Sequence, residues 1–386
     1  MRILRNLFSI RNNNSDEEGA RLFNKHIWPF YMEDGWEFVD DINNAEVVTS
    51  LFNFNPINID MLKRLKPRQI LLILSIFHID ETYEKEFYLK VLEEYRKVFP
   101  NCFIVHKNKA IQDVEGLIYY DCMFNRHKLY YHDYHKIESL VNSFPIGNKD
   151  IIWTAGATKE MFNIPQEKAN PQNCRVFLSP GLLYQGMFLP RMRYRAGLKD
   201  FLRLHYDDKG YINSAGNNFL PNNASEGIER NIQRPDGAGG YWYPIGDRYY
   251  KETYISIYVE TLTVSDFNTR CVTEKTFDPL IKGNFILPFA YSGFIKDVKS
   301  YGFRFPDFID YSYDDIKDND KRFFAYMRTI DMMFRINHNF RQTYEDNLHI
   351  IKHNRKVFID RPYDNLYNKV KEQLSKIPVP NTASAL

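Results

Sequence analysis

The chain has 386 residues, with 51 lysines and arginines against 49 aspartates and glutamates, so its net charge is only +2. This length exceeds what one hydrophobic core usually holds and predicts two domains. The balanced charge excludes a protein whose overall field recruits a polyanion, so any contact with nucleic acid must come from a local patch.

The cysteines, the apolar runs and the aromatic residues narrow the class of protein. Four cysteines show no paired spacing, which is typical of a reducing compartment and indicates no structural zinc site. The longest apolar run, residues 70–77, is too short to span a bilayer, and charges interrupt the only apolar stretch of the N-terminus. We therefore expect a soluble cytoplasmic protein with no membrane contact. The 27 Tyr and 30 Phe fit either stacking surfaces for sugars or bases or an aromatic core.

Short apolar runs alternate with helical patterns through the first half of the chain. Strands are expected near residues 1–10, 36–39, 46–50, 70–76 and 102–106, and helices up to about residue 31, at 61–65 and at 81–98. Such alternation predicts a parallel sheet with helices on both faces.

Residues 121–135 form the densest polar and aromatic stretch, with basic side chains interleaved between tyrosines and phenylalanines. They could grip a nucleic-acid strand through phosphate contacts and stacking. They could equally form a hydrated surface on which long cationic side chains lie, and this surface role is the reading we prefer. The histidines His127, His132 and His135 lack the spacing of a zinc signature, so no metal is predicted.

A proline-containing stretch at residues 163–173 is predicted to link the two domains. Beyond it we expect a strand at 174–178, a glycine-containing loop and a helix at 191–203. Arg191 and Arg195 are four apart and share one face near the start of that helix. Either they bind an anion there or they belong to a solvated basic face.

Residues 254–290 are predicted to form a strand, a polar loop, a short helix and a second strand. The first strand ends in Glu260, Thr273 to Thr276 open the helix, and Gly283 closes it. The charged loop thus follows the carboxyl end of a strand, which is where ligands bind in open α/β sheets.

The opening of this helix has a chemical interpretation. Lys275 lies beside free backbone N–H groups and the positive end of the helix dipole, which together favour a diphosphate. Glu274 could accept hydrogen bonds from the hydroxyls of a ribose. The alternative is a helix start that carries an ordinary solvated Glu–Lys pair.

These residues resemble a known motif. The strand that ends in Glu260, the Thr273-Glu274-Lys275 sequence, and the strand containing Pro288 are similar to the nucleotide-sugar motif of the α1,3-fucosyltransferases and related GT-B glycosyltransferases. Residues 300–305 and 310–315 resemble glycosyltransferases encoded by tailed bacteriophages, and the whole resemblance covers residues 174–320.

The chain departs from the fucosyltransferases at two positions. Thr261 and Asp278 stand where that family has asparagines. This puts GDP-fucose in doubt as donor and leaves the diphosphate chemistry standing. UDP-glucose or UDP-arabinose is the donor that we favour.

The resemblance implies an α/β protein of the GT-B class, with two Rossmann-like parallel-sheet domains that face a cleft. Residues 1–165 would bind the acceptor, 166–350 the nucleotide sugar, and 351–386 would hold a helix that packs back and a tail. The donor is a co-substrate, and no other cofactor is implied. The donor site would consist of Arg191, Arg195, Glu260, Thr273, Glu274 and Lys275. The positive charges of Lys275, Arg191 and Arg195 would replace a metal in an inverting transfer.

Such an enzyme also needs a base that takes the proton of the acceptor hydroxyl, on a loop at the strand ends of the first domain. His78 has a suitable ordinary pKa, and Asp80 is the carboxylate candidate. Asp80 could instead cap the helix that follows it. The pair Glu33-Asp34 and His106 are weaker rivals.

The resemblance to phage proteins makes 5-hydroxymethylcytosine in phage DNA the first candidate acceptor, in the host bacterial cytoplasm. The base would have to leave the stack, so double-stranded DNA is an expected partner. The alternatives are transfer to a surface polysaccharide or protein, and an inactive nucleotide- or DNA-binding module. The oligomeric state stays open.

Overall fold

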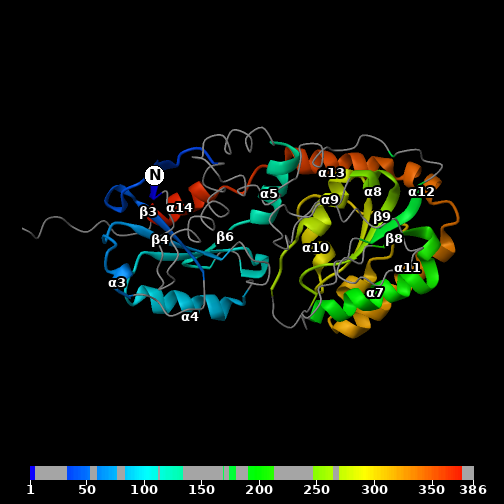
Figure 1. Cartoon of the computed structure of the whole chain (residues 1–386), viewed down its shortest axis with the longest axis horizontal. Coiled ribbons are helices and arrows are strands. Elements are labelled where there is room, and N and C mark those ends of the chain that lie inside the picture. Colours follow the sequence, from blue (N-terminus) through cyan, green and yellow to red (C-terminus); the bar gives the residue numbers. More distant parts are fainter. Residues whose placement is uncertain are drawn as a thin grey trace, which may run out of the picture. The chain divides into compact units, whose positions relative to one another are not determined.

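The computed structural model describes residues 1–4, 33–52, 59–75, 83–111, 114–133, 168, 174–179, 190–212, 247–263 and 269–375 (Figure 1). The chain divides into two compact units. The first contains residues 1–122, 138–153 and 364–386, and the second contains 123–137 and 154–363. Among the described helices, none is both long and apolar enough to cross a membrane.

The first unit is built on a six-stranded, wholly parallel sheet in the order β2-β1-β3-β4-β5-β6. Its strands are β1 (Arg2–Leu4), β2 (Glu37–Val39), β3 (Val47–Leu51), β4 (Ile70–Ser75), β5 (Cys102–His106) and β6 (Leu117–Tyr119). Its helices are α3 (Ile59–Leu62), α4 (Lys85–Arg96) and α14 (Leu366–Ser375), with short 3-10 turns η1 (Ile42–Asn44) and η3 (Lys109–Ile111). All residues of β4 and β5 are buried, as parallel strands covered on both faces require.

The last described helix, α14, returns to this first unit. Glu33 caps it, since its two carboxylate oxygens accept hydrogen bonds from the N–H groups of Leu366 at 2.7 Å and Tyr367 at 2.6 Å. Lys369 donates to the carbonyl oxygen of Tyr119, at the end of β6, at 2.7 Å. The C-terminal part of the chain therefore completes the unit that its first residues begin.

The second unit contains a four-stranded, wholly parallel sheet in the order β10-β9-β7-β8. Its strands are β7 (Arg175–Ser179), β8 (Gly210–Ile212), β9 (Thr253–Val259) and β10 (Phe285–Phe289). Its helices are α5 (Cys122–Tyr131, in this unit from Met123 onward), α7 (Pro190–Tyr206), α8 (Asp247–Lys251), α9 (Glu274–Lys282), α10 (Phe294–Lys299), α11 (Asn319–Ile336), α12 (Phe340–Asp346) and α13 (Leu348–Asp360). The 3-10 turns are η7 (Asp207–Lys209) and η8 (Ser312–Asp315).

Helices cover both faces of this second sheet. Figure 1 shows α7 and α11 on one side of it and α9 and α13 on the other. The apolar core includes Ile255, Ile257 and Val259 of β9 together with Leu198 of α7 and Ile330 of α11. The two wholly parallel sheets confirm the predicted α/β class with two Rossmann-like sheets.

The edge strand β10 is covered by tyrosines rather than left open. Tyr311 donates to the carbonyl oxygen of Ile286, and Tyr313 to that of Pro288, both at 2.6 Å. Pro288 has no N–H to give to a neighbouring strand, so it is tolerated at an edge. The hydroxyl groups satisfy carbonyls that could otherwise pair with another chain.

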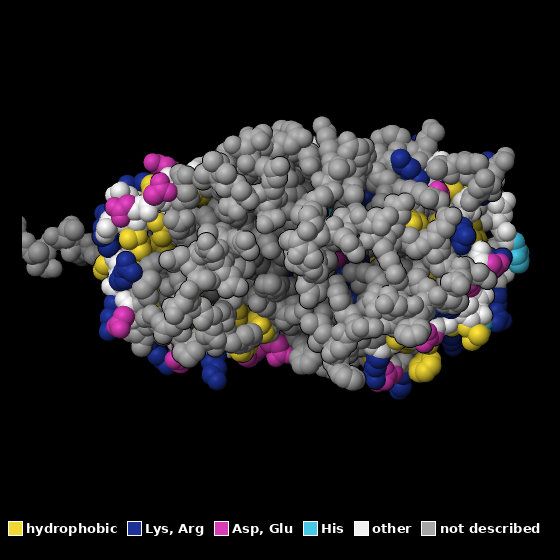
Figure 2. Space-filling model, viewed as in Figure 1, with side chains coloured by type: hydrophobic (Ala, Val, Ile, Leu, Met, Phe, Trp, Pro, Cys, Tyr) yellow, Lys and Arg dark blue, Asp and Glu magenta, His cyan; other side chains and the backbone are white. Residues whose placement is uncertain are grey.

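Most expected elements lie where the pattern placed them. The structure adds β6, which the pattern did not predict, while the expected helix up to residue 31 and most of the expected linker at 163–173 lie outside the described residues. The four cysteines, all among the described residues, form no disulfide. Where Figure 2 shows described side chains, basic and acidic groups are interspersed and do not gather into one basic patch.

Candidate functional site

The order of strands in the second unit marks a position for a ligand. The chain goes from β7 to β8 on one side and returns to β9 on the other side of β7. In open parallel sheets, the crevice outside the carboxyl ends of the two strands at such a reversal is the usual ligand site. Glu260 follows the last residue of β9, and α7 follows β7, so the predicted donor residues belong to this position.

Glu260 is fully buried and its carboxylate is fully engaged. One oxygen accepts from the N–H of Thr273 at 3.3 Å and the hydroxyl of Thr276 at 2.8 Å. The other accepts from the N–H of Thr261 at 2.8 Å and the hydroxyl of Thr273 at 2.6 Å. A carboxylate has about four lone-pair positions. Glu260 therefore joins the end of β9 to the start of α9, and its oxygens are occupied by the protein itself.

Thr273 begins α9. Its hydroxyl oxygen accepts from the N–H of Lys275 at 3.4 Å while it donates to Glu260, as a capping residue does. At the other end Gly283, with φ of 88°, closes the helix in the left-handed region. Glu274 and Lys275 are thus held in the first turn of a helix that is capped at both ends.

Lys275 turns back across the start of the helix. Its Nζ donates to Oε1 of Glu274 at 2.5 Å and to the hydroxyl of Thr261 at 3.3 Å. Adjacent helical residues do not normally face each other. Only 14% of the Lys275 side chain and 18% of the Glu274 side chain are exposed. The alternative of an ordinary solvated pair is therefore wrong.

Glu274 is a buried carboxylate that keeps its charge. Burial alone would raise its pKa, but nearby positive groups outweigh burial and hold the pKa below its ordinary value. The largest of these contributions comes from Lys275, which also donates a hydrogen bond to Glu274, and Arg126 adds to it. Its second oxygen, Oε2, is closed to solvent and receives no hydrogen bond from the part of the chain that the structure describes. A buried acceptor without a donor costs roughly 1–3 kcal/mol, which calls for an explanation.

The predicted surface role of the polar and aromatic stretch at 121–135 is wrong for several of its polar residues in α5, whereas His132, just after the helix, is exposed. The exposed fractions of Asn125, His127 and Lys128 in α5 are 1%, 4% and 5%. Lys128 donates to the carbonyl oxygens of Ile359, at 2.7 Å, and Arg361. Because the free carbonyls at the end of α13 attract a cation, the ammonium group can be buried. These described residues are therefore unsuited to contact DNA.

The two predicted arginines lie in the first turns of α7, after β7. Arg195 is 5% exposed, so it does not belong to a solvated basic face. The side chain of Arg191 lies outside the described residues. The structure thus brings Glu260, Thr273, Glu274 and Lys275 into one hydrogen-bonded cluster; Thr261 and Thr276, which had no predicted role, complete it.

The residues proposed as catalytic base, His78 and Asp80, lie outside the described residues, and their role stays a prediction. Their rivals have other tasks. Both oxygens of Glu33 cap α14, as described above. His106 is fully buried, with its ring centre 5.3 Å from that of Tyr88, and burial lowers its pKa to about 3. A buried and weakly basic imidazole is poorly suited to deprotonate an acceptor.

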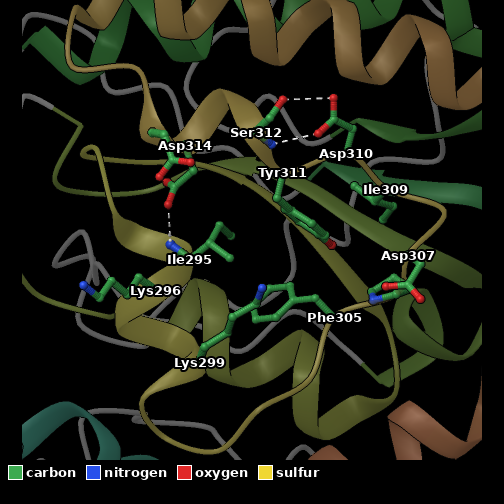
Figure 3. A pocket seen from close by; sticks show the side chains of 12 residues that line it. Ile295, Lys296, Lys299, Phe305, Asp307, Ile309, Asp310, Tyr311, Ser312 and Asp314 are labelled. Atoms are coloured by element: carbon green, nitrogen blue, oxygen red, sulfur yellow. Dashed lines mark hydrogen bonds between the residues drawn. The ribbon is translucent and has the colours of Figure 1, made fainter.

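An open pocket of about 630 Å³ lies elsewhere in the second unit, between α10 and residues 305–315 (Figure 3). Two of its acidic groups serve local structure: Asp314 accepts from the N–H of Ile295 at 2.8 Å, and Asp310 accepts from the N–H of Ser312 at 2.9 Å. Its lining shares no residue with the predicted donor site.

No family model and no curated protein matches the chain. A crystal structure of an α1,3-fucosyltransferase aligns with 94% of this chain and 92% of that chain, at 11% sequence identity. The TM-score is 0.39, and a likeness at that level carries no weight for fold or activity.

Proposed function

We propose that this protein is a glycosyltransferase that binds a nucleoside diphosphate sugar at the carboxyl ends of β7 and β9. One observation carries the proposal. At the strand reversal, the ionised carboxylate of Glu274 has one oxygen on Lys275 and one oxygen without a donor in the described chain. A ribose hydroxyl is a donor that this oxygen would accept.

The proposed roles follow from position. Glu274 would accept from the ribose, and Lys275 with the start of α9 would bind the diphosphate. Arg191 and Arg195 would approach it from α7. Glu260 would act indirectly, because it holds the helix start in place. Since Oε2 of Glu274 is closed to solvent, donor binding requires a neighbouring group to move aside.

The reaction would be a direct displacement. The acceptor oxygen forms a bond to the anomeric carbon, while the bond from that carbon to the diphosphate oxygen breaks. The acceptor proton passes to a base, for which His78 and Asp80 remain the candidates. Positive groups around the diphosphate would stabilise its departing charge without a metal, and a single displacement inverts the anomeric centre.

UDP-glucose or UDP-arabinose remains the favoured donor. One of the two departures from the fucosyltransferases has a local explanation, because Asp278 accepts from Tyr131 of α5 at 2.9 Å. It therefore serves the packing of α9 and does not argue for or against a particular sugar.

The preferred acceptor is still 5-hydroxymethylcytosine in phage DNA, with a surface polysaccharide or protein as the alternative. The burial of Asn125, His127 and Lys128 in α5 removes part of the stretch at 121–135 that could have contacted DNA. An inactive nucleotide- or DNA-binding module is the remaining alternative.

The test is to incubate the protein with hydroxymethylated duplex DNA and UDP-sugars, and to measure released UDP and the mass of the modified nucleoside. We expect UDP release and a hexose or pentose added to the base. UDP release without a mass change would discard DNA as acceptor and keep the glycosyltransferase. Neither signal, with GDP-sugars also silent, would favour the inactive module.

Lys275→Ala serves as the matched variant. We expect it to abolish release of the nucleoside diphosphate while the circular-dichroism spectrum stays unchanged. Lys321→Ala, which removes an exposed lysine from α11, is the control and should keep full activity. Full activity in Lys275→Ala would remove this residue from the site.

A further inference from the structure

We propose that Thr263 is a further binding residue of the donor site and that its hydroxyl group contacts the sugar part of the nucleotide sugar. The inference rests on the proposed function and adds to it a residue that lies outside the Thr273-Glu274-Lys275 motif. Its basis is a buried hydroxyl group that makes no hydrogen bond within the described chain.

Thr263 lies three residues after Glu260, beyond the carboxyl end of β9. Only 2% of the residue is exposed. Its Oγ1 is closed to solvent and has no hydrogen-bond partner in the part of the chain that the structure describes. Among the described side-chain oxygens of the second unit, the same is true of one other atom, Oε2 of Glu274. Both atoms thus belong to the edge of the sheet at which a ligand is expected.

The neighbouring threonines are all engaged, which makes Thr263 the exception. The hydroxyl groups of Thr273 and Thr276 donate to Glu260 at 2.6 and 2.8 Å, and that of Thr261 accepts from Lys275 at 3.3 Å. A buried hydroxyl group without a partner destabilises a protein, whereas a valine of nearly the same shape has no polar atom to satisfy. The fold alone therefore gives no reason for a hydroxyl group at position 263.

The backbone of Thr263 is held firmly on the protein. Its carbonyl oxygen accepts from Nη2 of Arg322 at 2.8 Å. Arg322 is fully buried, and its Nε donates to the carbonyl oxygen of Ala290, directly after β10, at 3.0 Å. The carbonyl oxygen of Leu262 accepts from the N–H of Tyr291 at 3.1 Å. The segment that follows β9 is therefore fixed to the end of β10 before any ligand arrives.

The contacts of Lys275 indicate which part of the donor Thr263 would contact. Nζ of Lys275 donates to Glu274 at 2.5 Å and to Thr261 at 3.3 Å, and the N–H groups of an ammonium diverge, so these partners lie on different sides of it. In the proposed function Glu274 binds the ribose and Lys275 the diphosphate. Thr263 follows Thr261 by two residues, at most about 7 Å of chain. It therefore belongs to the side of the diphosphate away from the ribose, where the sugar is attached.

A threonine hydroxyl suits a sugar because it has the same hydrogen-bonding capacity as a sugar hydroxyl, one donor and two acceptor positions. A buried polar group also discriminates against a ligand that leaves it without a partner. Thr263 would thus contribute to the choice among donor sugars. Because its oxygen is closed to solvent, the sugar, like the ribose, enters when a neighbouring group moves aside.

The experiment compares Thr263→Val with the wild type by calorimetric titration of UDP, GDP, UDP-glucose, UDP-arabinose and GDP-fucose. For the nucleotide sugar that the wild type binds, we expect the affinity to fall roughly two- to tenfold, the range for one lost hydrogen bond. The affinity for the corresponding diphosphate should not change. The unfolding temperature of Thr263→Val should equal or exceed that of the wild type, because valine removes a buried polar group that has no partner. Thr263→Ser keeps the hydroxyl group and should retain the affinity for the nucleotide sugar.

Thr49→Val is the matched control. Thr49 lies in β3 of the first unit, is fully buried, and has a hydroxyl group that also lacks a partner in the described chain; its replacement should leave every affinity unchanged. In Thr263→Val, an unchanged affinity for the nucleotide sugar, an equal loss for the diphosphate, or a lower unfolding temperature would each overturn the role of Thr263 alone. A wild-type protein that binds none of the five ligands would overturn the proposed function, and this inference with it.

Discussion

At the scale of single residues, the two acids of the site differ in what their oxygens do. Glu260 receives four hydrogen bonds, one from the N–H of Thr261 after β9 and three from Thr273 and Thr276 at the start of α9, whereas one oxygen of Glu274 receives none from the described chain. The filled carboxylate of Glu260 supports local structure, whereas the unused acceptor of Glu274 is the oxygen to which the proposed ribose would donate. The number of hydrogen-bond donors around each carboxylate thus distinguishes the structural role of Glu260 from the proposed binding role of Glu274.

A prediction at this scale concerns Glu260. Its replacement in Glu260→Gln sets an amide N–H₂ group against donors, so we expect the free energy of unfolding to fall by about 2–4 kcal/mol, as measured by urea titration. Glu345→Gln is the control, because Glu345 pairs with Arg341 where both side chains are nearly half exposed; its effect should stay below about 0.5 kcal/mol. Equal effects in the two variants would contradict the structural role of Glu260 between the end of β9 and the start of α9.

At the scale of elements, α9 is defined by its two ends and by its packing. Thr273 begins it and Gly283 ends it, while α5 and α13 pack along it. A Cβ on Gly283 would lie 2.4 Å from Nη2 of Arg355. Arg355 is anchored in turn, because its Nε donates to the carbonyl oxygen of Ile281 at 2.9 Å. The end of α9 is therefore restricted by a neighbour as well as by its own backbone.

Two glycines separate these effects. Gly283 and Gly293 both have positive φ, 88° and 84°, but nothing lies within 4 Å of a Cβ placed on Gly293. Gly293→Ala should cost the backbone strain alone, about 1–2 kcal/mol. Gly283→Ala should cost about 1 kcal/mol more, because Arg355 must shift. Thermal unfolding of both variants measures the difference. Equal losses of unfolding free energy would mean that the side chain of Arg355 moves aside without a measurable cost.

At the scale of the whole molecule, each unit contains a carboxyl group that caps a helix, partly buried in the case of Glu33 and buried in the case of Asp314. Burial raises the pKa of Glu33 in the first unit from 4.5 to about 7, despite its hydrogen bonds to α14. Burial likewise raises the pKa of Asp314 in the second unit from 3.8 to about 7, despite its hydrogen bonds to α10. Both groups hold a proton more tightly in the folded state than in the unfolded state.

The resulting pH dependence has a definite sign. A raised pKa gives stability that is fully present below the unfolded pKa and is lost as pH rises through the folded one. Stability should therefore decline between about pH 4.5 and 7 on account of Glu33, and between about pH 3.8 and 7 on account of Asp314. Glu33→Gln and Asp314→Asn should each flatten the decline, as followed by thermal unfolding. An unchanged slope in both variants would refute the assignment.

The sequence by itself determined the strand, loop, helix and strand around Glu274 and Lys275. Apolar runs, the Thr273 cap and Gly283 are local signals, and local signals specify local structure.

Tertiary structure alone decided that Glu260 has no oxygen to spare and that α5 is buried. Lys128 reads as a surface charge because its partners, the carbonyl groups at the end of α13, lie more than 200 residues away in the chain. A local pattern does not encode which distant carbonyl or carboxylate will receive a charge, and that pairing decides whether the charge is buried or exposed.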